Sequence, residues 1–468
     1  MKQIAECVNK PARAEKVLFF GEGNFLRAFA AVAVKRMNER AGFDGSIVIL
    51  QGTEKGRAAD LNAQNGLYTV IERGYADGRP VETILPIDCV SRAVDPYADY
   101  GAFLALADNP DLALIVSNTT EAGIHYDENE RAGQEMYRNF PAKLTDFLYR
   151  RFSVFGGAAA AGLVVLPCEL IEENGRRLKE CVLRYAADWG LGKAFVGWIN
   201  EAMVFADTLV DRIVSGYPNA EADAICRRLG YEDCLLDACE PFFLWVIGST
   251  DRRVRTLPLE SAGAVLTDDI TPYRTRKVRI LNGAHTMSAP AGLLSGLETV
   301  EQLVCDKTFG RYIQRGLREE VIPACAGDGL KQYAADVIAR FHNPYLNHRL
   351  ADIALNSVSK WRARVLPSVK DFMTRYGKPP VILAFSFAAL YAFYANGEGV
   401  RDDGEAIARM RGAASVTACL ADARLWGEDL TALPGFAAAA ETQYRAITAI
   451  GARKAAERLT TEADHADD

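Results

Sequence analysis

The stretch from Lys16 to Leu50 constrains the fold more than any other part of the sequence. It opens with an apolar run, Lys16-Val-Leu-Phe-Phe20, passes through Gly21-Glu-Gly-Asn-Phe-Leu-Arg27 and an Ala-rich segment, and ends in a second apolar run, Ser46-Ile-Val-Ile-Leu50. Short apolar runs are typical of strands buried on both faces, and the Ala-rich segment carries apolar residues at helical spacing. Strand, glycine turn, helix and strand in this order predict a parallel βαβ unit.

The rest of the chain continues in two different ways. Apolar runs at 112–116 and 162–166 extend the alternation of strand and helix, so we expect a doubly wound sheet in the first half. Beyond about residue 270, apolar residues recur at helical spacing and strand-like runs become rare. We therefore predict an α/β fold with a Rossmann-type domain over residues 1–270 and a mainly α-helical domain over residues 271–468, which meet near Thr271-Pro272.

Composition narrows the classes of function. The 468 residues are 49% hydrophobic and 25% charged, as in a globular protein with a large core. The net charge of -7 argues against a nucleic-acid partner, which requires a basic face. We expect no membrane span, since no apolar run approaches about 20 residues, and a cytoplasmic location, since the start lacks the apolar core of a secretion signal. The ten cysteines are scattered without a CxxC pair, so we expect reduced thiols.

The glycine turn after the first strand is a candidate dinucleotide site. Gly21 would permit a tight turn, and Gly23 would let the backbone approach a pyrophosphate. Leu26 stands where the usual third glycine would be, and an ordinary glycine turn fits the same residues equally well. Glu54, after the second strand, could bind the ribose 2′-hydroxyl of NAD, whereas the nearby Lys55 and Arg57 could equally favour the 2′-phosphate of NADP.

The segment 271–285 is the candidate catalytic region. Asn282 and His285 are three residues apart and would share a helix face, with Lys277 at the start of that helix. Removal of a hydride from a secondary alcohol requires a base for the proton and donors for the oxygen, and a lysine can be the base if burial lowers its pKa. A solvated lysine and a helix-capping asparagine would explain the same residues without any chemistry.

This K-x4-N-x2-H pattern resembles the signature of the polyol-specific long-chain dehydrogenases, the mannitol dehydrogenase family. Further similar segments follow one another in order along nearly the whole chain: GEGNFLRAF at 21–29, Asn65–Tyr68, Ser117–Gly123, Pro167–Leu170, Leu209–Ile213 and Arg340–Pro344. Several segments, among them LPCELIEENG at 166–175, resemble the sequences of one branch of the family. That branch reduces the ketouronate tagaturonate to the sugar acid altronate. Fructuronate reduction and oxidation of mannitol or another polyol are the alternatives within the family.

The resemblance implies a role for each matching residue. Lys277 would be the general acid/base, Asn282 would hydrogen-bond the reacting oxygen, and His285 would orient substrate hydroxyls. Lys360 falls where the family has a substrate-binding lysine. NAD would be the cofactor, with NADP as the alternative, and no metal would be needed. The cofactor contacts would be Gly21, Gly23, Asn24, Phe25, Glu54, Thr120 and Glu121.

Two positions depart from the family pattern. Asp207 replaces a second asparagine that donates to the reacting oxygen, and a carboxylate there would repel an oxyanion unless it were protonated or turned away. Asp207 would then pair with a cation such as Lys277, or Asn200 would replace it, or the substrate would differ. Asp352 stands where polyol dehydrogenases have an arginine, so an anionic substrate would need Arg340, Arg362 or Arg364 instead.

An alternative from a different class of function is that the chain is a regulatory protein, which binds the cofactor but has lost catalytic activity. This hypothesis explains Asp207 and leaves the intact Lys277, Asn282 and His285 without a purpose. A metal enzyme is disfavoured, because the one plausible histidine pair, His342 and His348, has no adjacent acid ligand. The sequence leaves the oligomeric state open.

Overall fold

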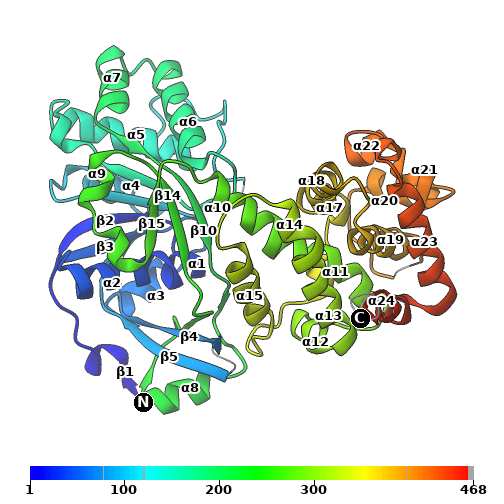
Figure 1. Ribbon diagram of the computed structural model, residues 1–468. Helices are drawn as coiled ribbons and strands as arrows, with labels where there is room; N and C mark the ends of the chain where they lie inside the picture. Colours follow the sequence, from blue (N-terminus) through cyan, green and yellow to red (C-terminus); the bar gives the residue numbers. More distant parts are fainter. Residues whose placement is uncertain (77–78, 120–121, 397, 462–468) are drawn as a thin grey trace. The chain divides into compact units, whose positions relative to one another are not determined.

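The computed structural model describes residues 1–76, 79–119, 122–396 and 398–461, which form two compact units (Figure 1). The first unit comprises Met1–Arg73 and Val81–Ile270, and the second comprises Gly74–Pro80 and Thr271–Asp468. Because 74–80 belong to the second unit, the chain passes between the units three times.

A six-stranded parallel sheet forms the centre of the first unit. Its strand order is β6-β3-β2-β7-β8-β9, and Phe20 at the end of β2 pairs with Leu50 on one side and Ser117 on the other. The order reverses beside β2, as in doubly wound folds, which confirms the prediction from the apolar runs. The strands are β2 (Ala14–Phe20), β3 (Gly45–Leu50), β6 (Val90–Val94), β7 (Leu114–Ser117), β8 (Val164–Pro167) and β9 (Val204–Phe205).

Helices cover both faces of this sheet because successive strand residues point to opposite sides. Val17 and Phe19 of β2 belong to one core, with α1 (Asn24–Ala28) and α2 (Ala30–Ala41). Leu18 and Phe20 belong to the other core, with α4 (Tyr100–Ala105), α5 (Phe140–Val154), α6 (Asn174–Asp188) and α7 (Lys193–Glu201). Gly42 ends α2 in the left-handed conformation, and its N–H donates to the Met37 carbonyl.

Three smaller sheets complete the first unit. They have the orders β11-β13-β4-β5, β10-β14-β15 and β1-β12. Their strands are β1 (Lys2–Gln3), β4 (Tyr68–Ala76), β5 (Arg79–Ile87), β10 (Asp207–Asp211), β11 (Val214–Gly216), β12 (Tyr231–Glu232), β13 (Asp237–Cys239), β14 (Leu244–Gly248) and β15 (Ala264–Thr267). The short helices α3 (Ala58–Ala63), α8 (Ala222–Leu229) and α9 (Arg252–Thr256) connect them.

The second unit is helical apart from the 74–80 segment, as the sequence predicts. Its centre is α19 (Val381–Asn396), which is apolar around its circumference and packs against α11 and α23. The other helices are α10 (Thr271–Arg276), α11 (Gly283–Leu293), α12 (Val300–Cys305), α13 (Lys307–Arg315), α14 (Ile322–Ala324), α15 (Leu330–Phe341), α16 (Leu350–Ile353), α17 (Ser357–Arg364), α18 (Leu366–Tyr376), α20 (Gly404–Gly412), α21 (Val416–Leu420), α22 (Ala423–Trp426), α23 (Phe436–Ile450) and α24 (Ala452–Thr461). Two π-helical segments, η5 (Lys277–Asn282) and η6 (Gly316–Val321), interrupt this pattern.

Three general expectations can be compared with these elements. Pro272 lies in the first turn of α10, where a proline is tolerated, so it starts a helix there instead of breaking one. All ten cysteines are free thiols. Among the helices in the described part of the chain, none combines the length and the apolar character that crossing a bilayer requires.

Candidate active site

The two glycines after β2 serve different purposes. Gly21 has a φ of 120°, which side-chain-bearing residues rarely adopt, and its N–H donates to the Leu50 carbonyl over 2.9 Å. Gly23 has an ordinary φ of -62° and precedes α1. A Cβ atom added to Gly23 would meet no atom within 4 Å. The backbone therefore requires glycine at position 21, whereas glycine at position 23 leaves open space above the turn.

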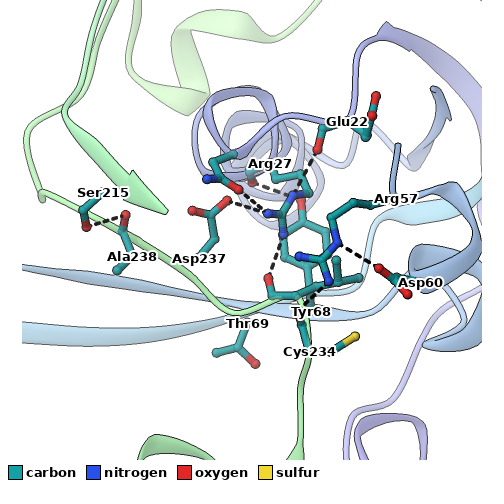
Figure 2. Close-up of polar contacts among 12 residues, drawn as sticks. Glu22, Arg27, Arg57, Asp60, Tyr68, Thr69, Ser215, Cys234, Asp237 and Ala238 are labelled. Atoms are coloured by element: carbon teal, nitrogen blue, oxygen red, sulfur yellow. Dashed lines mark hydrogen bonds and ion pairs between the residues drawn. The ribbon is translucent and has the colours of Figure 1, made fainter. Parts of the chain in front are cut away.

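The Arg27 side chain holds this turn in place through hydrogen bonds (Figure 2). Its side chain is 1% exposed and donates to three acceptors: the Glu22 carbonyl at 3.2 Å, the Leu235 carbonyl at 2.7 Å and the Asn24 Oδ1 at 2.6 Å. The C=O and N–H of a trans peptide point in opposite directions. Since Arg27 holds the Glu22 carbonyl inward, the Gly23 N–H of the same peptide points away from Arg27.

Other buried groups hold Arg27 and its helix. The Asp237 carboxylate lies 3.4 Å from the guanidinium, and burial raises the pKa of Asp237 to about 7. The Tyr68 hydroxyl donates to the Arg27 carbonyl over 3.0 Å. At the end of α1, the buried Arg212 donates to the Ala28 carbonyl over 2.7 Å. The family-like segments that contain Tyr68 and Arg212 therefore support the glycine turn.

Asn24 and Phe25, two predicted cofactor contacts, also have partners within the turn. The Asn24 side chain accepts the hydrogen bond from Arg27, and the Phe25 ring stacks on Phe29 with centroids 4.7 Å apart. These contacts fix the shape of the turn.

A cavity of about 260 Å³ opens beside the glycine turn, at the carboxyl ends of β2, β3 and β7. Its lining includes Gly21, Gly52, Thr119, Arg138 and Lys143. Open α/β sheets bind ligands at this edge, where the strand order reverses. The cavity therefore lies where a dinucleotide would be expected.

Lys143 is a member of this lining that the sequence analysis missed, because no motif marks it. It lies on α5, is 4% exposed, and donates from Nζ to the Tyr97 hydroxyl over 2.9 Å. Burial lowers the pKa of Lys143 to about 8.

Two carboxylates, Glu54 and Glu22, lie near the loop after β3. Glu54 is exposed and forms an ion pair of 2.8 Å with Arg138. Glu22, which the sequence analysis passed over, accepts a hydrogen bond of 2.7 Å from the Gly52 N–H. No local pattern marks Glu22, because only the fold brings the first turn against the loop after the second strand.

Thr120 and Glu121, also predicted as cofactor contacts, lie outside the described residues. The preceding residue, Thr119, is held by the buried Glu169, which accepts hydrogen bonds from the Thr119 N–H at 2.9 Å and from the Ser117 hydroxyl at 3.0 Å. The segment Pro167–Leu170 thus fixes the start of the loop that lines the cavity.

In the second unit, a π-helical turn brings Lys277 and Asn282 together. Five residues of α-helix would leave the two side chains about 140° apart around the helix axis. In a π-helix the hydrogen bonds join residues i and i+5, so residue 282 lies about one turn beyond residue 277. The sequence analysis expected Lys277 at the start of a helix, but the helix already begins at Thr271.

His285 lies one turn beyond Asn282 on α11 and is 7% exposed. Its ring stacks on Phe341 with centroids 4.2 Å apart and meets the His348 ring edge-to-face at 4.9 Å. Burial, and then the nearby His348 and three cationic side chains, lower the pKa of His285 well below its usual value. The Nε2 atom is buried and has no hydrogen-bond partner among the described residues.

The three cations that act on His285 are Arg340, Lys360 and Arg364. Lys360 donates to the Ile353 carbonyl over 2.9 Å, and Arg364 donates to the Thr286 hydroxyl over 3.4 Å. Lys360 and Arg364 are four residues apart and share a face of α17. The structure therefore groups both predicted substrate-binding cations with Arg340 around the predicted catalytic histidine.

Arg362 and Asp352 are not part of this group. Arg362 lines a separate hollow of about 610 Å³ with Arg409 and Arg424. Asp352 is exposed and forms an ion pair of 2.7 Å with Arg401, which holds the pKa of that carboxyl below its usual value.

Asp207 lies at the start of β10 in the first unit. Its Oδ1 accepts a hydrogen bond of 3.1 Å from the backbone N–H of Arg176, in the first turn of α6. A carboxylate or an amide oxygen can accept this bond equally well. Asn200, the suggested replacement donor, is exposed on α7. Among the described residues, no group of three or more His, Cys, Asp and Glu side chains is arranged to hold a metal ion.

Comparison with known proteins accounts for nearly the whole chain. Residues 15–261 match the mannitol dehydrogenase Rossmann domain, and residues 269–448 match the mannitol dehydrogenase C-terminal domain. The chain belongs to the mannitol dehydrogenase family. It is an oxidoreductase that acts on CH–OH groups, and the resemblance found in the sequence is confirmed.

Curated relatives and solved structures add detail to this assignment. The chain is 42% identical to an altronate oxidoreductase of Bacillus subtilis, over 95% of each chain, and 40% identical to one of Pectobacterium atrosepticum, over 96% of this chain and 98% of that one. The fold is shared with a D-sorbitol dehydrogenase in substrate-free form, at a TM-score of 0.82 and 23% identity, over 97% of this chain and 100% of that one. It is also shared with a mannitol 2-dehydrogenase of Pseudomonas fluorescens in ternary complex with NAD and D-mannitol, at a TM-score of 0.70 and 23% identity, over 96% and 94%.

Proposed function

We propose that the chain catalyses the reversible, NAD-dependent interconversion of tagaturonate and altronate. The observation that carries this proposal is the group of Arg340, Lys360 and Arg364 around the buried His285. Nearby cations stabilise the carboxylate of a sugar acid more strongly than they stabilise the hydroxyl groups of a neutral polyol. The names of relatives about 40% identical over nearly the full chain support the same substrate.

The residues of the second unit suit the proton and the oxygen in this reaction. When tagaturonate is reduced, Lys277 gives a proton to the carbonyl oxygen, and in the reverse direction it takes the proton from the alcohol. The Asn282 amide donates a hydrogen bond to the same oxygen while negative charge develops on it. The π-helical turn, which brings these two side chains to neighbouring positions, supports a shared target.

The first unit fits a dinucleotide. The nicotinamide ring, when bound, supplies the hydride. The open space above Gly23 and the cavity at the carboxyl ends of β2, β3 and β7 lie where such a ligand would bind. Around the loop after β3, Glu54 pairs with Arg138 and Asp60 pairs with Arg57, and Glu22 adds a carboxylate, so a 2′-phosphate would find both arginines already paired. These contacts favour NAD over NADP.

One panel of assays tests the proposal. Purified protein is mixed with NADH or NADPH and with tagaturonate, fructuronate or fructose, and with NAD or NADP and mannitol, while absorbance at the nicotinamide band is followed. We expect the highest kcat/KM with tagaturonate and NADH. A preference for fructose and mannitol would assign a polyol dehydrogenase, and NADH binding without turnover on any of the substrates would assign the regulatory alternative.

A further inference from the structure

His348 is a half-buried residue to which the reaction described above gives no role. It follows α15 in the chain. Its ring packs edge-to-face with the ring of His285, at a centroid distance of 4.9 Å and an interplanar angle of 80°. Since His285 also stacks on Phe341, two aromatic neighbours fix the orientation of its ring. The His348 side chain therefore contacts His285, the histidine predicted to orient the substrate.

The backbone around His348 is held firmly. The His348 carbonyl accepts a hydrogen bond of 3.0 Å from the Val300 N–H, and the Leu350 N–H donates to the Glu298 carbonyl over 2.8 Å. Thr299 and Arg349 form an antiparallel bridge between these two bonds. A residue that recognises a ligand needs this kind of fixed support, because rigid side chains lose little entropy on binding.

The surroundings of both imidazoles favour the neutral form, since they lower both pKa values. Burial and the charge of Lys360 lower the pKa of His348, and the opposing effect of Asp352 is smaller than that of burial. The pKa of His285 is lowered further by its four cationic or imidazole neighbours. A neutral imidazole has one N–H donor and one acceptor nitrogen, and a sugar hydroxyl can form a hydrogen bond with either of them.

His285 also shows that this place is built for a polar ligand. Its Nε2 is buried and has no hydrogen-bond partner among the described residues, and an unsatisfied polar atom in such a place is costly. A hydroxyl of the substrate would satisfy it. The neighbouring carbon of a sugar acid carries a second hydroxyl, which lies within reach of a side chain next to His285.

We propose that His348 is a substrate-binding residue and that His348 and His285 form hydrogen bonds with two neighbouring hydroxyl groups of the sugar acid. The surrounding cations Arg340, Lys360 and Arg364 act on the carboxylate, and the two imidazoles act on the hydroxyls. The inference deepens the proposed function and rests on it, since it assigns the contacts of the same substrate.

Two substitutions separate hydrogen bonding from ring packing. His348→Phe keeps an aromatic ring against His285 but removes both nitrogens, whereas His348→Asn keeps one donor and one acceptor but removes the ring. His342→Phe is the matched control, because His342 contacts Cys305 and Tyr75 instead of His285. For each variant, kcat and KM with tagaturonate, the Kd of NADH and the melting temperature are measured.

The expected result is a decrease of roughly 10- to 100-fold in kcat/KM for His348→Phe, mainly through KM, because a buried substrate hydroxyl loses its partner. His348→Asn should recover part of this loss, and the NADH Kd and the melting temperature should change little in either variant. Near wild-type values for His348→Phe, or a larger loss for His348→Asn than for His348→Phe, would assign ring packing and overturn the inference. A wild-type protein without activity on any ketouronate would instead refute the proposed function, and this inference with it.

Discussion

The guanidinium of Arg27 lies 3.4 Å from the carboxylate of Asp237, and both side chains are almost completely buried. Within the part of the chain that the structure describes, neither Asp237 oxygen accepts a hydrogen bond. Attraction to the arginine and loss of hydration therefore act on this carboxyl in opposite directions. Loss of hydration is the larger effect, since the pKa of Asp237 is raised to about 7.

This raised pKa predicts a pH dependence of stability. Between about pH 4 and pH 7 the folded chain retains a proton on Asp237 that the unfolded chain has lost, so the free energy of unfolding decreases as the pH rises through this window. Asp237→Asn, which mimics the protonated group, should remove that part of the slope and stabilise the protein at pH 8. Urea unfolding at pH 5 and pH 8 measures the effect, with the exposed Asp60→Asn as control. Equal slopes in wild type and Asp237→Asn would contradict the assignment.

Gly23→Val should weaken NADH binding while the protein stays folded. The backbone at Gly23 suits any residue and its side-chain space is empty, so the added methyl groups would enter only the space expected for the cofactor. Fluorescence titration with NADH measures the affinity, and thermal melting reports the fold. Gly21→Val is the contrasting variant: the φ of 120° at Gly21 predicts a loss of stability there. An unchanged NADH affinity in folded Gly23→Val would show that this glycine only forms a turn.

Lys277→Ala should lower turnover by at least roughly 10²-fold, the usual effect of losing a general acid/base, with unchanged NADH affinity. The lysine acts on the proton of the substrate, and the glycine turn that would bind the cofactor belongs to the other unit. Steady-state kinetics with tagaturonate and a separate NADH titration provide the two measurements. Turnover close to that of the wild type would exclude Lys277 as the acid/base.

Asp207→Asn should retain or increase activity and alter its pH profile. The amide would keep the acceptor for the Arg176 N–H and add the N–H donor that the family pattern has at this position. The pH dependence of kcat/KM from pH 5 to 9 is the measurement, and Asp207→Ala, which removes both functions, is the comparison. Abolished activity in Asp207→Asn would assign the carboxylate a catalytic role that the mechanism above lacks.

Local patterns in the sequence predicted the elements whose own residues specify them. The apolar runs gave β2, β3, β7 and β8 because a strand buried on both faces needs apolar residues throughout. The small sheets were missed because strands such as Val214–Gly216 carry no alternating pattern and form only by pairing with distant segments. The sequence alone gives Arg27 no role, because its partner Asp237 lies 210 positions further along the chain.

The candidate site shows the same limit. The signature identified Lys277, Asn282 and His285, but the turn that brings the first two together is π-helical, and helical propensity does not distinguish it from an α-helix. His342 and His348 looked like a pair in the sequence. The fold separates them: His342 contacts Cys305, and His348 contacts His285.

The π-helical turn also limits how many residues can separate Lys277 from Asn282. Deletion of one residue between Lys277 and Asn282 would allow an ordinary α-helix, in which the lysine and the asparagine still lie on one face at positions i and i+4. The same deletion would leave α10 at roughly its present rotation relative to α11, because the π-helical turn accommodates one extra residue without moving the lysine off that face. Active relatives should therefore keep the lysine and the asparagine on one face, through this π-helical turn or through an α-helix that is one residue shorter, even where the apolar residues of the segment vary. A search for such enzymes gains more from the number of residues between lysine and asparagine than from their identity.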